Sequence, residues 1–243
     1  MTEPQLSKVE LTEIADFRGN LSFAEEGHPI PFSIQSVFWT TLKQDYSLHT
    51  EAATFFIVLD GEVQLKHHTL ERPNQACYAE KGSRLELRLM SESAILLMLM
   101  DRKIPAKDTC SQRTDRLVDL PQTEYYPGLK GYFANANSTL PCGIKRVYFT
   151  YQIPHFAKRG GHAHIYTKEL VLPLKGGVEV LVDNNKSKST YPLSVGQQGL
   201  FLDIGLWREL ENFKDNSLLL VIASEKYFEP DYIRNYRDFK LKY

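Results

Sequence analysis

Short runs of aromatic and β-branched residues recur along the chain, and turn-forming Gly, Asn, Asp and Pro separate them. The clearest runs occupy residues 36–41, 54–59, 95–100, 147–151, 170–174, 178–182 and 218–223. Apolar positions at helical spacing are scarce, whereas many short strands with frequent turns are typical of sandwiches and barrels. The pattern therefore predicts an all-β chain of sandwich or barrel type.

The two halves of the chain resemble each other. Residues 30–39 (I-P-F-S-I-Q-S-V-F-W) align with residues 140–149 (L-P-C-G-I-K-R-V-Y-F). His49, followed by F-F-I-V-L-D-G, aligns in the same way with His164, followed by L-V-L-P-L-K-G. A repeat of roughly 110 residues is too long for a solenoid and indicates a duplicated domain.

We therefore predict two tandem cupin-like domains, each a double-stranded β-helix or jelly-roll. The N-terminal domain is expected over residues 1–103 and the C-terminal domain over residues 128–243. The intervening residues 104–127 are rich in charged residues, Pro and Gln, and we expect them to form a linker.

Composition excludes several classes of protein. The 243 residues carry a formal net charge of -1, so no overall basic field exists to attract nucleic acid. The first residues lack the pattern of a signal peptide, and the longest apolar run, 94–100, is too short to cross a bilayer. Three scattered cysteines without a C-x-x-C pair favour reduced thiols. We expect a cytoplasmic protein that binds neither nucleic acid nor membranes.

The stretch R-G-G-H-A-H at residues 159–164 carries the clearest chemical signal. His162 and His164 are two residues apart, so on a strand they point to the same side. Two imidazole rings directed into a concave sheet can hold a metal ion or transfer protons at neutral pH.

The spacing of this stretch also resembles the first part of the cupin metal motif. His162-x-His164 is followed by Glu169 and Gly176, and three such ligands would suit Mn, Fe, Ni or Zn. The second part of the motif should supply another histidine, but the chain has Arg208 there. Arginine cannot act as a ligand, and its charge repels a dication. We therefore expect no metal.

Several motifs in a fixed order resemble the sugar nucleotide 3,4-ketoisomerases, the WxcM-like cupins. The C-terminal half has K-R-V-Y at 145–148, R-G-G-H-A-H at 159–164 and Y-F-E-P-D-Y-I-R-N-Y at 227–236. The N-terminal half resembles the family's opening segment through D-F-R-G-N-L at 16–21. These enzymes convert dTDP-4-keto-6-deoxyglucose to a 3-keto isomer on the route to amino sugars of bacterial surface polysaccharides such as lipopolysaccharide O-antigen. The resemblance implies an isomerase of a dTDP-linked sugar without a cofactor.

The resemblance also implies roles for individual residues. Moving a ketone from C4 to C3 requires proton removal from C3, an enediolate and proton return to C4. His164 is the implied base, with His162 as its partner or as a second proton carrier, and Tyr148 is a further catalytic candidate. The residues implied to bind substrate or stabilise the enediolate are Arg146, Arg159, Glu169, Trp207 and Arg208. Among them, Arg208 could bind the diphosphate.

Two positions depart from the family pattern. Glu169 stands where the family has glutamine, and Trp207-Arg208 stands where it has Trp-His. If Arg208 and Glu169 form an ion pair, the positive charge that one change introduces would balance the negative charge introduced by the other. The C-terminal half also has G-L-K-G at 128–131 in place of D-x-R-G. The sequence therefore leaves the particular sugar and the regiochemistry open.

The N-terminal half lacks most of these residues. Ser47 replaces the first histidine, and Ser36 and Phe38 replace the arginine and tyrosine of K-R-V-Y. His49 is kept, and we interpret it as structural. Because the N-terminal half retains D-x-R-G and the C-terminal half retains the histidines, we expect an intrachain pseudo-dimer with one active pocket. Association of two chains into a homodimer stays open.

Three other functions also stay open. An epimerase of the same substrate class would likewise remove a proton beside a keto group. A non-catalytic sugar-binding or regulatory cupin is compatible with Arg208 and Glu169, and a metal-dependent cupin oxygenase or isomerase is compatible with the His-x-His spacing. We interpret residues 227–243 as a packing element that covers the sandwich.

Overall fold

The computed structural model describes residues 6–104, 115–120, 122–138, 142–196, 198–214 and 216–243. Strands dominate this part of the chain, and its helical segments are a 3-10 turn, η1 (Glu229–Asp231), and a short helix, α1 (Tyr236–Lys242). No helix among these residues is long and apolar enough to span a membrane. The all-β prediction is confirmed.

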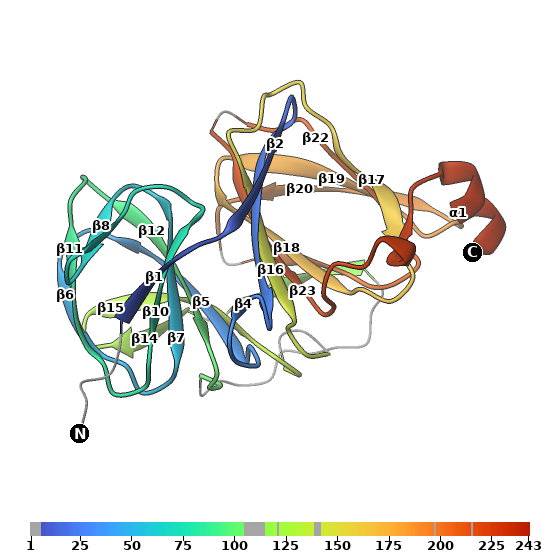
Figure 1. Ribbon diagram of the computed structural model, residues 1–243. Helices are drawn as coiled ribbons and strands as arrows, with labels where there is room; N and C mark the ends of the chain where they lie inside the picture. The colour runs from blue at the N-terminus through green and yellow to red at the C-terminus, as the bar shows by residue number, and fades with distance from the viewer. Residues whose placement is uncertain (1–5, 105–114, 121, 139–141, 197, 215) are drawn as a thin grey trace.

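The N-terminal half forms a sandwich of a larger and a smaller sheet (Figure 1). The larger sheet has the order β1 (Leu6–Glu10), β10 (Gln75–Ala79), β7 (Thr54–Asp60), β12 (Ala94–Met100), β5 (Ser36–Leu42), β15 (Leu129–Asn135) and β14 (Gln122–Tyr126). The smaller sheet has the order β6 (Tyr46–His49), β11 (Arg84–Leu89), β8 (Val63–Leu65) and β9 (His68–Leu70).

The C-terminal half repeats this arrangement. Its larger sheet has the order β13 (Asp115–Asp119), β21 (Gln198–Leu202), β18 (Glu169–Lys175), β23 (Leu218–Ala223), β16 (Arg146–Tyr151), β3 (Gly19–Glu26) and β2 (Thr12–Asp16), with β4 (Pro29–Ile30) beside β3. Its smaller sheet has the order β20 (Lys188–Ser194), β19 (Gly177–Asp183), β22 (Trp207–Glu211), β17 (Arg159–His164) and β24 (Tyr232–Ile233). The prediction of two tandem cupin-like domains is confirmed.

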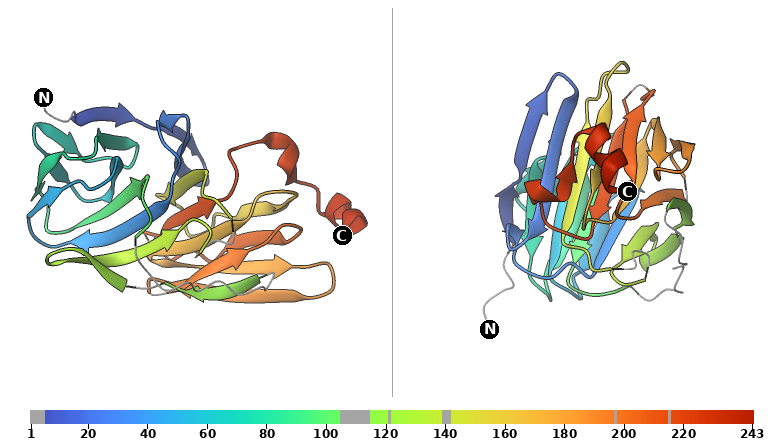
Figure 2. Two further views of the ribbon diagram at one scale, coloured as in Figure 1. Left: turned by 90° about the horizontal axis from the view of Figure 1, so that it is seen from below. Right: turned by 90° about the vertical axis from the view of Figure 1, so that its right-hand side faces the viewer.

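The two halves exchange a hairpin. Strands β2 and β3, from the first part of the chain, extend the larger C-terminal sheet (Figures 1 and 2). In this pairing Phe23 of β3 lies opposite Tyr148 of β16. Strands β14 and β15 extend the larger N-terminal sheet in the same way, with Phe133 opposite Phe38 of β5. In each half the preceding strand, β1 or β13, stays in its own half. Each larger sheet is therefore completed by residues from the other half.

This exchange crosses the boundaries expected from the sequence. Strands β13 and β14 lie within residues 104–127, the expected linker, although residues 105–114 and 121 are outside the described part. Val118 of β13 is buried in the core. Three of the five residues of β13 are charged, so its sequence does not show the alternation of apolar and polar positions that predicts a strand. The domain limits 1–103 and 128–243 stay a prediction.

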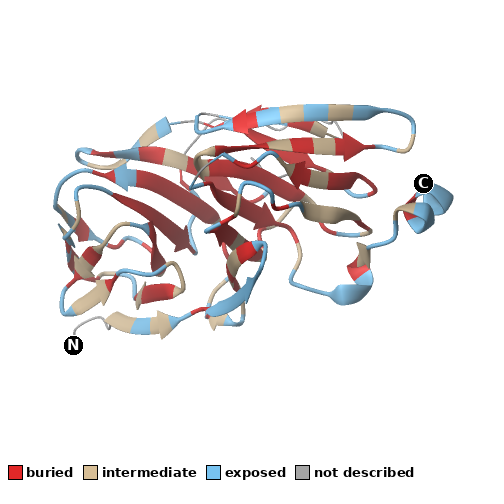
Figure 3. Cartoon of the chain, turned by 90° about the horizontal axis from the view of Figure 1, so that it is seen from above, coloured by how far each residue is buried: buried red, intermediate tan, exposed pale blue. Residues whose placement is uncertain are grey.

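The two larger sheets share an apolar core, seen as the buried strands in Figure 3. Residues of both halves form it, among them Val37, Trp39, Leu97, Leu99, Val147, Phe149, Leu220 and Ile222. Alternation along β16 places Val147 and Phe149 in this core. Arg146, Tyr148 and Thr150 therefore face the smaller C-terminal sheet, where they line a cavity.

The C-terminal segment returns along the smaller sheet after β23. Strand β24 pairs with β17, so that Tyr232 lies opposite His164. Helix α1 begins after Asn235, whose side-chain oxygen accepts a hydrogen bond from the backbone N–H of Arg237 at 2.8 Å. Phe239 of α1 is buried against Trp207, with ring centroids 5.8 Å apart. This packing anchors the segment beside β17, the histidine strand, which carries His162 and His164.

Candidate active site

A cavity of about 530 Å³ lies inside the C-terminal sandwich. Residues of β16, β17, β18, β22 and β23 line it, and the exchanged hairpin β2–β3 contributes a wall that includes Asp16, Arg18 and Glu25. The C-terminal segment adds Tyr227 and Tyr232. Both ends of the chain therefore border the same cavity.

The tip of the exchanged hairpin is held in place by direct contacts. The guanidinium group of Arg159 donates hydrogen bonds of 3.0 and 3.2 Å to the backbone carbonyl of Arg18. Gly19 follows with φ +98°, and a Cβ atom there would lie 2.7 Å from the carbonyl oxygen of Gln152. The D-x-R-G turn therefore needs its glycine for conformation and for close approach.

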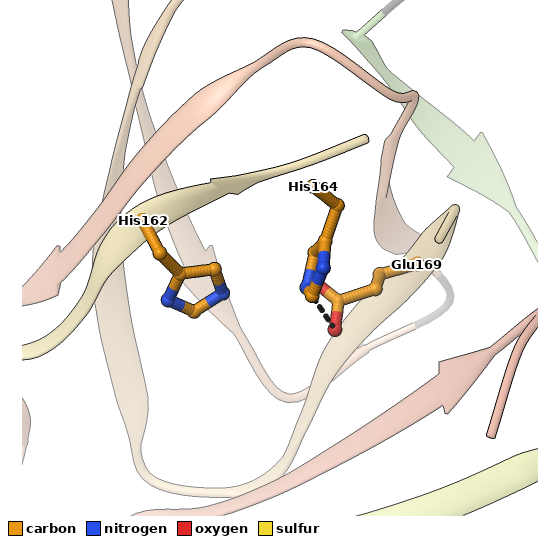
Figure 4. Close-up of side chains that lie close together, drawn as sticks. All are labelled: His162, His164 and Glu169. Carbon is orange, nitrogen blue, oxygen red and sulfur yellow. Dashed lines mark ion pairs between the residues drawn. The ribbon is translucent and has the colours of Figure 1, made fainter. Parts of the chain in front are cut away.

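A bulge at Gly160 orients the histidines. The pairing of β17 with β22 shifts register at a bulge between Gly160 and His162. Gly160 has φ +75°, and a Cβ atom there would lie 2.6 Å from the carbonyl oxygen of Arg208. After the bulge, His162 and His164 point to the same side, with ring centroids 4.9 Å apart (Figure 4).

His162 faces the cavity with free ring nitrogens. Both nitrogens are buried and have no hydrogen-bond partner among the described residues. Burial lowers the pKa of His162 to about 3, and the positive charge of Arg208 contributes to the shift. At neutral pH the ring is therefore uncharged, and one nitrogen can accept a proton.

His164 lies behind His162 and is fully buried. Its Nδ1 is 2.7 Å from Oδ2 of Asp231, and its Nε2 is 3.5 Å from Oε1 of Glu169 (Figure 4). Burial raises the pKa of Asp231, but hydrogen bonds with His164 and Thr167 outweigh it and leave that pKa below its usual range. His164 is thus held between two carboxyl groups.

Glu169 connects the histidines to other cavity residues. Its Oε1 accepts a 2.7 Å hydrogen bond from the hydroxyl group of Tyr148, and its Oε2 lies 3.8 Å from Nη1 of Arg208. Burial opposes ionisation of Glu169, yet its contact with His164 and the charge of Arg208 hold its pKa well below the usual range. The expected Arg208–Glu169 ion pair is present.

The cavity has an excess of positive charge. Its walls include the arginines 18, 146, 159, 208 and 234 against the three carboxylates of Asp16, Glu25 and Glu169. Arg208 is 1% exposed, and none of its guanidinium nitrogens has a hydrogen-bond partner among the described residues. A buried cation without hydrogen bonds is costly. This cavity therefore suits an anionic ligand that supplies the missing acceptors.

His162, His164 and Glu169 are also residues that could hold a metal ion. Ligand atoms of His162, His164 and Glu169 lie within 4.8 Å of one another. However, Glu169 already accepts from Tyr148, and the fixed charge of Arg208 is 3.8 Å away. Two unit charges about 4 Å apart interact by roughly 4 kcal/mol at an effective dielectric constant of 20, and a dication doubles this repulsion. The residues present do not fit a divalent cofactor.

Most residues predicted from the sequence meet at this cavity. Those that line it are Arg146, Tyr148, Arg159, His162, Glu169 and Arg208. Trp207 is different, because it lies on the opposite face of β22 from Arg208 and packs against Tyr236 and Phe239. It is therefore a packing residue and does not reach the cavity.

The sequence interpretation missed the contribution of the C-terminal segment. Residues 227–243 were expected only to pack, which is correct for α1. The preceding residues, however, bring Tyr227, Tyr232 and Arg234 to the cavity and Asp231 to His164. The sequence marked this segment only through the D-Y-I-R motif of the family resemblance, which names no partner for the aspartate; the structure shows that the aspartate is 3% exposed. A buried carboxylate in such a motif indicates a specific partner.

Comparison with known proteins identifies the family of this chain. The family model described as WxcM-like, C-terminal (FdtA) matches the chain twice, over residues 5–118 and 113–243. A curated relative, the TDP-4-oxo-6-deoxy-alpha-D-glucose-3,4-oxoisomerase of Aneurinibacillus thermoaerophilus, is 33% identical over 104 residues. The aligned part covers 43% of this chain and 75% of that relative.

Solved structures of sugar ketoisomerases are also similar. QdtA, a sugar 3,4-ketoisomerase from Thermoanaerobacterium thermosaccharolyticum in complex with TDP, is 26% identical with a TM-score of 0.50, covering 54% of this chain and 96% of its own. WlaRB, a TDP-quinovose 3,4-ketoisomerase from Campylobacter jejuni, is 27% identical with a TM-score of 0.50, covering 54% and 99%. With the family model matching both halves, the chain belongs to the WxcM-like, C-terminal family.

Proposed function

We propose that the chain is a sugar nucleotide 3,4-ketoisomerase that acts on a dTDP-4-keto-6-deoxyhexose. One observation carries the proposal: His162, an uncharged histidine, and the guanidinium group of Arg208 face the same cavity, and neither makes a hydrogen bond to the described residues. A base beside a cation is what enolisation of a keto sugar requires. The activities of the relatives, and TDP bound to QdtA, support the substrate class.

His162 is placed by geometry to take the proton from C3. Burial and the charge of Arg208 hold its pKa at about 3, and the negative charge of a bound sugar nucleotide would offset Arg208 and raise that pKa toward the working range of a base. The electron pair of the C3–H bond then forms the C3–C4 double bond, and the carbonyl pair moves to the oxygen on C4. The sequence ranked His164 first, but His164 is held by Asp231 and Glu169 and does not line the cavity. The role of base therefore passes to His162 in this proposal.

The enediolate needs positive groups close to its oxygens, and Arg208 and Arg146 face the cavity on either side of Tyr148 and Glu169. Such preorganised donors each contribute about 10²–10³-fold to the rate in comparable sites. The hydroxyl group of Tyr148, hydrogen-bonded to Glu169, can carry the proton of the C3 hydroxyl group to the oxygen on C4. The electron pair left on the C3 oxygen then forms the new carbonyl group as C4 takes back the proton held by His162. Arg159 and Arg234 at the wall are candidates for the diphosphate.

We further propose that the chain works as an intrachain pseudo-dimer with one pocket. The hairpin β2–β3 of the N-terminal half supplies Asp16, Arg18 and Glu25 to the cavity of the C-terminal half. The histidines come from the C-terminal half alone. Synthesis of a deoxysugar for a bacterial surface polysaccharide in the cytoplasm is the context that the resemblance favours.

The test is proton NMR of the full chain with dTDP-4-keto-6-deoxyglucose in deuterated buffer. We expect the C3 proton signal to disappear while 3-keto resonances appear. His162→Gln should lower the rate by about a thousandfold, because a general base contributes roughly 10²–10⁴-fold. His49→Gln, an exposed histidine of the N-terminal half, is the control and should leave the rate unchanged.

Other outcomes of this experiment are equally informative. Exchange at C3 with an inverted centre and no 3-keto product would replace the proposal by an epimerase. Binding of the sugar nucleotide without any exchange would replace it by a sugar-binding protein.

A further inference from the structure

We propose that Asp231, in the C-terminal segment, is a positioning residue of this site. It fixes the ring of His164 and, through Glu169, the hydroxyl group of Tyr148 that faces the cavity. The catalytic consequence rests on the proposed function, whereas the positioning itself can be tested without turnover.

The contacts of Asp231 leave its carboxylate a single orientation. Oδ1 accepts hydrogen bonds from the backbone N–H groups of Ile165 at 2.9 Å and Tyr166 at 2.6 Å. Oδ2 accepts from the hydroxyl group of Thr167 at 2.6 Å and lies 2.7 Å from Nδ1 of His164. An ionised carboxylate has no proton to donate, so Nδ1 of His164 must carry the proton of this bond.

The fixed ring transmits this constraint toward the cavity. With Nδ1 bound to Asp231, the opposite edge of the ring packs against Glu169, where Nε2 lies 3.5 Å from Oε1 without forming a hydrogen bond. The same Oε1 accepts the hydrogen bond from Tyr148 at 2.7 Å. Tyr148 lines the cavity, whereas Asp231 does not. Asp231 therefore acts on the reacting groups only through His164 and Glu169, as the third member of a base–orienter arrangement does.

Helix α1 explains how Asp231 is kept at this place. The hydroxyl group of Tyr236 donates a 2.5 Å hydrogen bond to Asp183, and Phe239 is buried against Trp207. Both contacts anchor the segment on β19 and β22, the strands that continue the sheet from β17. Burial of α1 therefore holds η1, and with it Asp231, against the histidine strand.

Asp231→Asn separates positioning from folding. The amide oxygen can still accept from the backbone N–H groups of Ile165 and Tyr166, while the amide nitrogen presents a donor to His164. We expect kcat to fall by about a hundredfold, within the roughly 10²–10⁴-fold range of acid–base groups, with KM unchanged because the arginines stay in place. Asp238→Asn, an exposed aspartate of the same segment, is the matched control and should leave both constants unchanged.

A second measurement does not need turnover. Nitrogen-15 NMR of histidine-labelled protein, with His164 assigned from the spectrum of His164→Gln, should show a protonated Nδ1 in the wild-type chain. In Asp231→Asn that proton should move to Nε2. An unprotonated Nδ1 in the wild type, or an unchanged His164 signal and kcat in Asp231→Asn, would overturn the positioning role. Normal NMR signals without any isomerisation by the wild type would count against the proposed function alone.

Discussion

The interiors of the two sandwiches differ although most of their strands correspond. In the C-terminal half, Tyr148 lies on β16 between Phe23 and Val221 of the neighbouring strands and faces the cavity. In the N-terminal half, Phe38 occupies the corresponding place on β5, between Phe133 and Met98. Phe38 is fully buried, and its ring packs 5.2 Å from that of Tyr125.

The difference shows what each half contributes. The N-terminal interior is a packed apolar cluster that includes Phe38, Phe56, Val58, Leu85, Leu87, Met98 and Phe133. Each such side chain stabilises the fold by roughly 1.5–3 kcal/mol on burial. The C-terminal interior also has an apolar cluster, but beside it lie nitrogens of His162 and Arg208 that make no hydrogen bond to the described residues. A buried polar group without a hydrogen bond costs about 1–3 kcal/mol. The N-terminal interior is therefore filled by apolar packing, whereas the C-terminal interior keeps a polar cavity.

We expect the largest effect from removing one aromatic side chain from each interior and comparing the losses in the free energy of unfolding. Phe133→Ala removes a 1% exposed ring from the packed interior, and we expect the free energy of unfolding to fall by about 3–5 kcal/mol. Phe23→Ala changes the corresponding position of the exchanged hairpin, which already borders the cavity, and should cost less. Chemical denaturation of the two full-length variants makes the comparison. Equal losses would mean that the two interiors are equally packed.

A pair of glycine variants probes the geometry of the cavity. Gly160→Ala would bring a Cβ atom to 2.6 Å from the backbone of Arg208, displacing β22 relative to His162. We expect isomerisation to slow by about a hundredfold, since a misplacement near 1 Å can cost that much. Gly161→Ala also has positive φ but meets no atom within 4 Å, so only roughly 1–2 kcal/mol of backbone strain is expected. Similar rates for the two variants would contradict a role for the bulge.

Acid should destabilise the C-terminal half through His162. The folded-state pKa is about 3, below the ordinary 6.5, so the unfolded chain binds more protons between these values. The contribution of the neutral ring is complete above pH 6.5 and is lost as pH falls toward 3, at up to about 1.4 kcal/mol per pH unit. His162→Gln should flatten this part of the stability curve. Parallel curves for wild type and His162→Gln would show that the ring is not held neutral by the fold.

Local pattern was enough to predict several features of the molecule. Strand-length apolar runs gave the all-β class, because alternation along a strand is a local property. The two-residue spacing of His162 and His164 predicted rings on one side. Both features depend on neighbours in sequence. The Arg208–Glu169 ion pair joins two different strands, and it was predicted from two departures from the family pattern.

Features that depend on distant segments were not predicted. The sequence indicated that the D-x-R-G segment serves the other half only because each half keeps a motif that the other half lacks. It did not predict that the D-x-R-G hairpin pairs with β16, because that pairing is a long-range contact. Trp207 was grouped with Arg208, although adjacent residues of a strand face opposite sides. The bond from Asp231 to His164 spans 67 residues, and no local pattern reports such a contact.

The most direct test of one open and one filled interior is isothermal titration calorimetry of the full-length chain with TDP. The cavity of the C-terminal half predicts one molecule of TDP bound per chain, and the apolar cluster that fills the N-terminal half leaves no second site. A stoichiometry of one would support this account. Two molecules per chain would show that the N-terminal half kept a pocket, and no binding would show that the cavity is not a nucleotide site.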